Sequence, residues 1–160
     1  MKLNGNIIWR KSWCGSYPDA RGVTVIKIEP ITCTRISENR FDTHSSHSNA
    51  NNLKNHLNGL ADGTVVIGVT GREPTWRLSN AHGALNNFGV NVNDVGYRGS
   101  FAFVGEKGNS TKTKMDKATS SGQSNNNPGQ VEVTIRGKRK VAYMRQQQHA
   151  QHGVNIITPT

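Results

Sequence analysis

The stretch that decides the fold is Thr64-Val65-Val66-Ile67-Gly68-Val69, a continuous apolar run between Gly63 and Gly71. A run this short, with a glycine near each end, is typical of a β-strand that is buried on both faces. The sequence on either side must therefore supply both the neighbouring strands and the elements that cover the sheet.

Alternating segments on both sides of this run predict the neighbouring strands. Before it, residues 23–28 alternate and are β-branched, Pro30 interrupts the pattern, and residues 31–36 resume it before a turn at Asn39 and Arg40. After it, residues 100–105 predict a strong strand. Shorter or later strand candidates are residues 90–92, 131–136 and 141–144. The polar segment 106–128 is expected to be a long loop.

Two helices are predicted between the strands. Leu53, Leu57 and Leu60 recur at helical spacing after a Ser-rich entry, which predicts a helix over residues 49–60. Leu78, Ala81, Leu85 and Phe88 predict a second amphipathic helix, with Gly89 as its C-cap. Strands that flank two short helices indicate the α+β class, with helices covering one or both faces of a mixed sheet.

Composition limits the possible functions. The 160 residues suffice for one domain, 33% of them are hydrophobic, and none lies in an apolar run long enough to span a membrane. The first ten residues contain no apolar signal core, so we expect any secretory leader to be absent from this sequence. Twenty basic residues against ten acidic ones give a net charge of +10, which favours anionic partners.

No catalytic, nucleotide-binding or metal-binding motif is present, so we expect neither an enzyme nor a bound cofactor or metal. His44 and His47 beside Asp42 are better explained as a helix-entry loop than as metal ligands. Cys14 and Cys33 allow either one disulfide or two free thiols. Asn109-Ser110-Thr111 is an N-glycosylation sequon, a short pattern that also arises by chance.

The segment from Val95 to Phe101 is the most informative candidate site. Gly96 and Gly99 bracket Tyr97 and Arg98 immediately before a predicted strand. Glycines allow close backbone approach, an aromatic face packs on a sugar ring, and a guanidinium offers five donors in a fixed fork. The alternative is that Tyr97 packs into the core and Arg98 pairs with Asp94, and the pattern alone does not decide between them.

Two basic clusters are also candidates for binding. Arg136, Lys138, Arg139 and Lys140 form one, and Lys107, Lys112, Lys114 and Lys117 form the other. Nucleic-acid binding would require exposed aromatic residues among these charges, and Tyr143 is the only one nearby. Solubilising charge is therefore the favoured interpretation.

Several blocks in order resemble the interleukin-like EMT inducer family. They are residues 40–43 (Arg-Phe-Asp-Thr), 53–66, Glu73-Pro74, Leu78, Leu85, Gly89, and 95–108, which is similar to the family block G-[FWY]-R-D-x-[WF]-x-F-x-G-x-K-G. Gly99 stands where that block has Asp. The resemblance covers about residues 20 to 136 and implies a compact β-β-α domain of two sheets lined by short helices. Residues 1–19 then form an N-terminal segment and residues 137–160 a C-terminal extension.

The family includes secreted cytokine-like proteins and the stem domain of protein O-mannose N-acetylglucosaminyltransferase, a carbohydrate-binding module. The arginine of the family block corresponds to Arg98, and Glu73 stands near the family's partner carboxylate. The resemblance therefore implies a secreted, non-enzymatic lectin for terminal sugars of the galactose or N-acetylhexosamine type. The implied carbohydrate-binding residues are Arg98, Tyr97, Glu73, Arg72, Trp76 and Gly99.

Such a site would be shallow and weak, so we expect glycans or glycoproteins as partners of a multivalent homo-oligomer. Membrane insertion is not expected and nucleic acid is disfavoured. Two other classes stay open: a cytokine-like ligand of a protein receptor, and a basic polyanion binder.

Overall fold

The computed structural model describes residues 2–3, 6–7, 21–30, 32, 34–71 and 73–118. Several features predicted from sequence lie outside these residues: Cys14, Cys33, Arg72, the strands over 131–136 and 141–144, and the basic cluster at residues 136–140.

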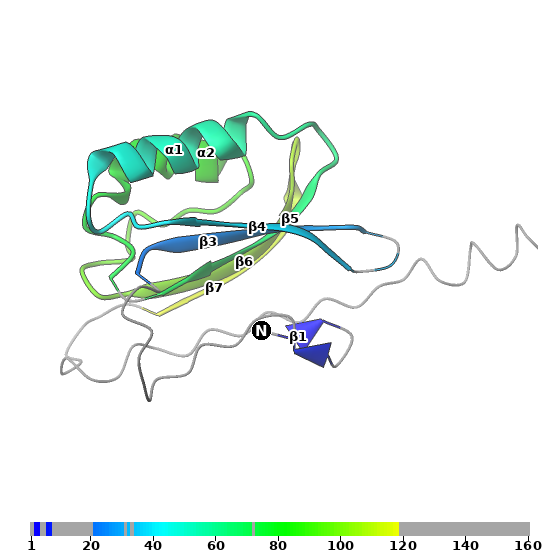
Figure 1. Ribbon diagram of the computed structural model, residues 1–160, viewed down its shortest axis with the longest axis horizontal. Helices are drawn as coiled ribbons and strands as arrows, with labels where there is room; N and C mark the ends of the chain where they lie inside the picture. Colours follow the sequence, from blue (N-terminus) through cyan, green and yellow to red (C-terminus); the bar gives the residue numbers. More distant parts are fainter. Residues whose placement is uncertain are drawn as a thin grey trace, which may run out of the picture.

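The described residues form an α+β fold, which confirms the predicted class (Figure 1). Five strands form one sheet in the order β4-β3-β5-β6-β7, and a separate pair, β1 and β2, forms an antiparallel ribbon. The two short helices lie on one face of the five-stranded sheet. The strands are β1 (Lys2–Leu3), β2 (Asn6–Ile7), β3 (Val23–Ile28), β4 (Arg35–Phe41), β5 (Val65–Thr70), β6 (Ser100–Glu106) and β7 (Asn109–Ala118). The helices are α1 (His47–Asn58), the 3-10 turn η1 (Leu78–Ala81) and α2 (His82–Asn86).

The five-stranded sheet is antiparallel at every pairing, so the expectation of a mixed sheet was wrong. The reason lies in the connection that contains α1. It joins β4 to β5, which run in the same direction, but β3 lies between them and pairs antiparallel with both. The helical connection therefore joins two strands that are parallel to each other but are not neighbours in the sheet.

In the first hairpin, the turn and the second strand lie at other residues than the sequence predicted. The chain turns between Glu29 and Thr34, where the Glu29 N–H donates to the Thr34 carbonyl at 2.9 Å. Pro30 thus belongs to the turn, and the second strand begins at Arg35 and includes the residues predicted as a turn, Asn39 and Arg40. This strand lies at the sheet edge and most of its side chains are at least partly exposed, so no apolar alternation marks it.

The predicted helices are confirmed near their expected positions. Ser46 caps α1 by accepting from the Asn49 N–H, and Leu53 and Leu57 on its inner face are fully buried. The second helical segment is split into η1 and α2, and Gly89 beyond it has a φ of +74°. A side chain at Gly89 would lie 2.6 Å from the Ser110 carbonyl oxygen, so both conformation and space require glycine there.

Two other predictions were wrong. Residues 90–92 form no strand, although Val90 and Val92 are buried. In the predicted loop 106–128, residues 109–118 form the long strand β7 after a turn at Lys107 and Gly108. Gly108 has a φ of +77°, which the tight turn requires. Because β7 is an edge strand with mostly exposed side chains, it carries little apolar signal.

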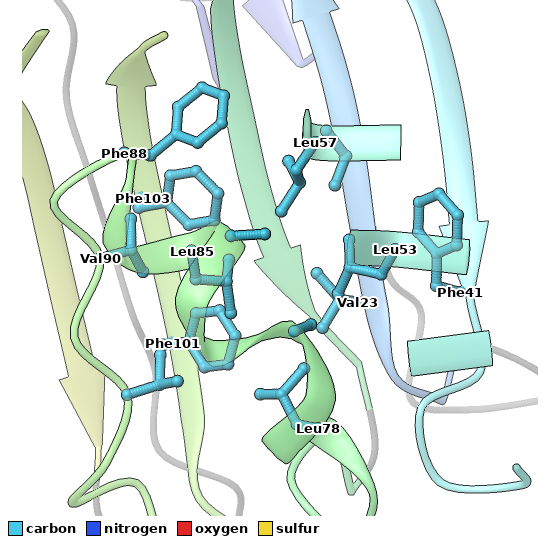
Figure 2. Packing of buried hydrophobic residues seen from close by; sticks show 14 of the residues in the cluster. Val23, Phe41, Leu53, Leu57, Leu78, Leu85, Phe88, Val90, Phe101 and Phe103 are labelled. Carbon is cyan, nitrogen blue, oxygen red and sulfur yellow. The ribbon is translucent and has the colours of Figure 1, made fainter. Parts of the chain in front are cut away.

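The core lies between the helices and the sheet (Figure 2). Val23 from β3, Leu53 from α1, Leu85 from α2 and Phe101 from β6 point toward one another there. The predicted burial of β5 on both faces is confirmed: Val66 belongs to this core, whereas Ile67 and Val69 alternate to the opposite face and are also buried.

Candidate functional site

The candidate site lies at the end of the sheet where β5 ends and β6 begins. The ladder between these strands stops at the pair Val69 and Ala102. Beyond it, the Thr70 hydroxyl donates to the Phe101 carbonyl and accepts from the Phe101 N–H, each at 3.0 Å. The side chain of Thr70 thus replaces the next backbone bonds. It joins the start of one loop, residues 71–77, to the end of another, residues 93–99.

One carboxylate connects the two loops. The Arg98 N–H donates to Oε2 of Glu73 at 2.7 Å, and the Thr75 hydroxyl lies 2.9 Å from Oε1. Glu73 and Arg98 have φ values of 43° and 62°, and they are the only non-glycine residues with positive φ in the described part of the chain. This left-handed conformation is strained for residues with a Cβ, and such strain often accumulates at functional sites. The interloop hydrogen bond holds both residues in it.

The loop that carries Glu73 is itself anchored to the body of the domain. The Thr43 side chain is fully buried and its hydroxyl donates to the Pro74 carbonyl at 2.6 Å. On the other side, the Thr75 hydroxyl lies 3.2 Å from the Gly96 carbonyl oxygen. These two threonines position the site and were not among the predicted site residues. Thr43 belongs to the block at residues 40–43 that resembles the family, and this block is the sequence signal that points to it.

The two loops present an exposed aromatic pair beside a guanidinium. Trp76 is 60% exposed and Tyr97 is 50% exposed, and their rings meet edge to face with centroids 5.6 Å apart. The Arg98 guanidinium carbon lies 5.1 Å from the Tyr97 ring centroid. Within the described residues, Arg98 makes no ion pair. We call Trp76, Tyr97 and Arg98 the aromatic–arginine face.

The alternative interpretation of this segment is contradicted. Tyr97 is not packed into the core, and Asp94 pairs with Lys117 instead of Arg98. The hydrogen bond from Lys117 holds the pKa of Asp94 below its ordinary value. Asp94 is therefore not the partner of the Arg98 guanidinium.

Gly99 has a packing role. A Cβ at this position would lie 2.7 Å from Val95 Cγ1 and 2.9 Å from the Ala118 carbonyl oxygen. Gly99 thus allows the 95–99 turn to pack closely against the end of β7. The aspartate of the family block does not fit here without displacing backbone.

The two other predicted site residues are Glu73 and Arg72. Glu73 is in the site, but both of its carboxylate oxygens already have partners within the protein. Its observed role is to position Arg98. Arg72 lies outside the described residues.

The helix-entry interpretation of Asp42 and His44 fits the structure. Oδ1 of Asp42 accepts from the N–H groups of His44 and Ser45, and Oδ2 accepts from Arg21 at 3.1 Å. In the described ranges, no group of three or more His, Cys, Asp and Glu side chains is placed to hold a metal ion.

A polar hollow of about 430 Å³ lies at the other end of β6. Asn86, Asn87, Lys107, Gly108 and Ser110 line it. It contains no aromatic ring and none of the predicted site residues. The Lys107 ammonium is already bound to the Leu57 carbonyl at 3.3 Å. The aromatic–arginine face therefore remains the stronger candidate for a sugar.

The basic cluster at residues 107–117 is partly neutralised. Lys112 pairs with Glu106 and Lys117 pairs with Asp94, so these two ammonium groups each face a carboxylate. This pairing agrees with the solubilising interpretation of the cluster. The cluster at residues 136–140 lies outside the described residues.

The fold and this face together define a small α+β domain that exposes an aromatic pair and an arginine on two loops joined by a carboxylate. Its sequence matches the family model of the interleukin-like EMT inducer over residues 21–109, and the chain belongs to that family. It is also similar to the human cell migration-inducing and hyaluronan-binding protein, with 29% identity over 114 residues. That match covers 70% of this chain but 8% of the relative's length.

No helix among the described residues has the length and apolar character needed to cross a membrane. The domain boundaries at residues 20 and 136 stay predictions, since the family match covers a shorter range inside them.

Proposed function

We propose that this protein is a secreted, non-enzymatic carbohydrate-binding domain that binds glycans on the aromatic–arginine face. The observation that carries the proposal is the exposed ring pair Trp76 and Tyr97 beside a guanidinium with no ion pair in the described residues. Membership of a family with a carbohydrate-binding module supports it, as does similarity to a relative whose name includes hyaluronan binding.

Each group on this face has a distinct task in the proposal. A pyranose packs its C–H side on an exposed ring, and Arg98 donates to ring hydroxyls or to the carbonyl of an N-acetyl group. Terminal galactose or N-acetylhexosamine units are the proposed ligands. Glu73 holds the backbone of Arg98 in place, so the guanidinium is oriented before a sugar arrives.

The affinity for one sugar should be low because the face is open and exchanges water hydrogen bonds for protein ones. We expect a Kd of about 1 mM, which corresponds to about −4 kcal/mol. Several sites on one homo-oligomer would raise the avidity of the protein for glycoproteins.

A glycan array followed by titration of the best glycan tests the proposal. Arg98→Ala should weaken binding by about 10-fold or more, because a hydrogen bond to a charged group contributes about 1.5–3 kcal/mol. Trp76→Ala should weaken it as well. Two matched controls keep their affinity: Arg35→Ala removes an exposed guanidinium on β4, and Ile36→Ala removes an apolar side chain that is 53% exposed.

Other outcomes would contradict the proposal. Equal binding by Arg98→Ala and wild type excludes this face as the site. Binding that follows sulfation alone and disappears with salt supports a polyanion binder. Capture of a protein receptor without any glycan binding supports a cytokine-like ligand.

A further inference from the structure

The β6–β7 turn carries a feature that glycan binding does not use. Asn109-Ser110-Thr111 is the single N-x-Ser/Thr sequon in the sequence, and it begins β7 directly after the turn at Lys107 and Gly108. Many such triplets are unusable because they are buried in a core or a ladder. The exposure and the hydrogen bonds of this sequon decide whether Asn109 is accessible to glycosylation.

The side chains of the sequon lie at an accessible edge. Gly108, Ser110 and Thr111 are exposed and Asn109 is half-buried. The Thr111 hydroxyl donates to Oδ1 of Asn109 at 2.9 Å. The carboxamide Nδ2 of Asn109, the atom that would carry a sugar, has no hydrogen-bond partner among the described residues.

Of the three sequon residues, Ser110 contacts the loop after α2, since a Cβ built at Gly89 lies 3.1 Å from the Ser110 Cβ. Two residues past the sequon, the Thr113 hydroxyl donates to the Phe88 carbonyl of the same loop. The register between β6 and β7 shifts between these contacts, so regular strand alternation does not run through the sequon. A glycan on Asn109 would therefore begin at a half-buried side chain at the turn end of β7.

We propose that Asn109 is N-glycosylated, and this inference rests on the passage through the secretory pathway that the proposed function implies. The donor is an oligosaccharide linked to a lipid through a pyrophosphate. Nδ2 of Asn109 forms a bond to the anomeric carbon of the first sugar, while the bond from that carbon to the pyrophosphate oxygen breaks. The pyrophosphate leaves with the electron pair, and the amide gives up one proton.

A glycan at this position suits the architecture in two ways. The aromatic–arginine face lies beyond the opposite end of β6, six residues or about 20 Å away, so it would stay open. In addition, β7 is the edge of the five-stranded sheet, and no strand among the described residues pairs with its outer side. A bulky polar group at an edge strand opposes edge-to-edge association.

The test is expression of the full chain behind a secretory leader in mammalian cells. Protein from the medium and from the membrane fraction is analysed by mass spectrometry before and after treatment with peptide N-glycosidase. We expect the mass of one glycan, and conversion of Asn109 to Asp on its removal. Asn109→Gln and Thr111→Ala should abolish the glycan, whereas Thr111→Ser, which keeps the sequon, should retain it.

Translocated protein with an unmodified Asn109, or a glycan that persists in Asn109→Gln, would overturn the inference. Because the assay needs no sugar ligand, it separates this inference from the proposed function. Asn109→Gln should bind glycans with the same affinity as the glycosylated protein. If Arg98→Ala fails to reduce glycan binding but Asn109 is modified, the proposed site is wrong and the modification stands.

Discussion

The carboxylate of Glu73 and the backbone N–H of Arg98 are joined at 2.7 Å, and both residues have left-handed backbone conformations. The two loops of the candidate site are thus joined through the Arg98 backbone and the Thr75 hydroxyl rather than through the guanidinium itself. This arrangement separates the two parts of Arg98: its backbone N–H is bound to Glu73, and its guanidinium lies over the exposed ring of Tyr97.

Removal of this acceptor should loosen the site without unfolding the domain. Glu73→Ala removes the acceptor of the Arg98 N–H and one partner of Thr75, so we expect a loss of about 1–2 kcal/mol in the free energy of unfolding. The Arg98 amide should exchange with solvent faster in an NMR hydrogen-exchange experiment. Glu38→Ala is the control, since it removes an equal charge from exposed ion pairs on β4. Unchanged protection of the Arg98 amide in Glu73→Ala would show that the bond does not hold the loop.

The strain at Arg98 can be separated from its function with two substitutions. Arg98→Ala keeps the unfavourable φ of 62°, whereas Arg98→Gly relieves it. We expect Arg98→Gly to be more stable than Arg98→Ala by about 1 kcal/mol, as measured by denaturant unfolding. Both variants should lose glycan binding alike. A glycine variant that is the less stable of the two would mean that the conformation carries no strain.

The aspartate that the family block places after the arginine should not be tolerated at position 99. Gly99→Asp and Gly99→Ala both place a Cβ near Val95 Cγ1 and the Ala118 carbonyl oxygen. Displacing these atoms should lower the free energy of unfolding by about 1–3 kcal/mol. Thermal unfolding measures the effect. If Gly99→Ala is neutral while Gly99→Asp is destabilising, the added charge and not the Cβ is the cause.

Most of the fold could be predicted from sequence because its central elements are buried. The apolar run at residues 64–69 and the leucines of α1 carry strong periodicity, and these elements are found at or near their predicted positions. The edge strands β4 and β7 were displaced or missed because exposed strands keep few apolar residues. The antiparallel direction of all strand pairs could not be predicted either, because β3 lies between the two strands that α1 connects.

The candidate site was predicted in its residues but not in its contacts. The pattern around Arg98 identified the aromatic neighbour and the nearby carboxylate. It could not show that Glu73 accepts from a backbone N–H. Nor could it show that Asp94 forms its ion pair with Lys117, 23 residues further along the chain, instead of with Arg98. Both facts depend on the approach of loops that only the folded sheet ends bring together.

His56 makes the stability of the domain depend on pH. Its ring packs against Phe41 with centroids 5.4 Å apart, and burial lowers its pKa below the ordinary value of 6.5. The unfolded chain therefore binds a proton at a higher pH than the folded chain does. The contribution of the neutral ring is fully present above pH 6.5 and is lost as the pH falls through this value toward the folded pKa. Denaturant midpoints at pH 7.5 and pH 5 should differ more in the wild type than in His56→Phe, which keeps a ring without a proton site. An equal change in both would assign the pH effect to other groups.

Gly68 and Gly83 test the effect of an added methyl group at a crowded and at an open position. A Cβ at Gly68 would lie 2.0 Å from Cε1 and 2.5 Å from Cζ of Phe103, which is fully buried. Gly68→Ala should therefore cost about 1–3 kcal/mol or more. At Gly83 in α2, a Cβ meets nothing within 4 Å, so Gly83→Ala should stabilise the protein by about 0.5–1 kcal/mol through helix propensity.

The partner of Gly68 can be tested in a double-mutant cycle. Phe103→Leu removes part of the ring that the new methyl group would meet, so Gly68→Ala should be less damaging in that background than in the wild type. Urea unfolding of the four proteins measures the coupling free energy. Additive effects would mean that the sheet moves to make room and that Phe103 does not restrict position 68.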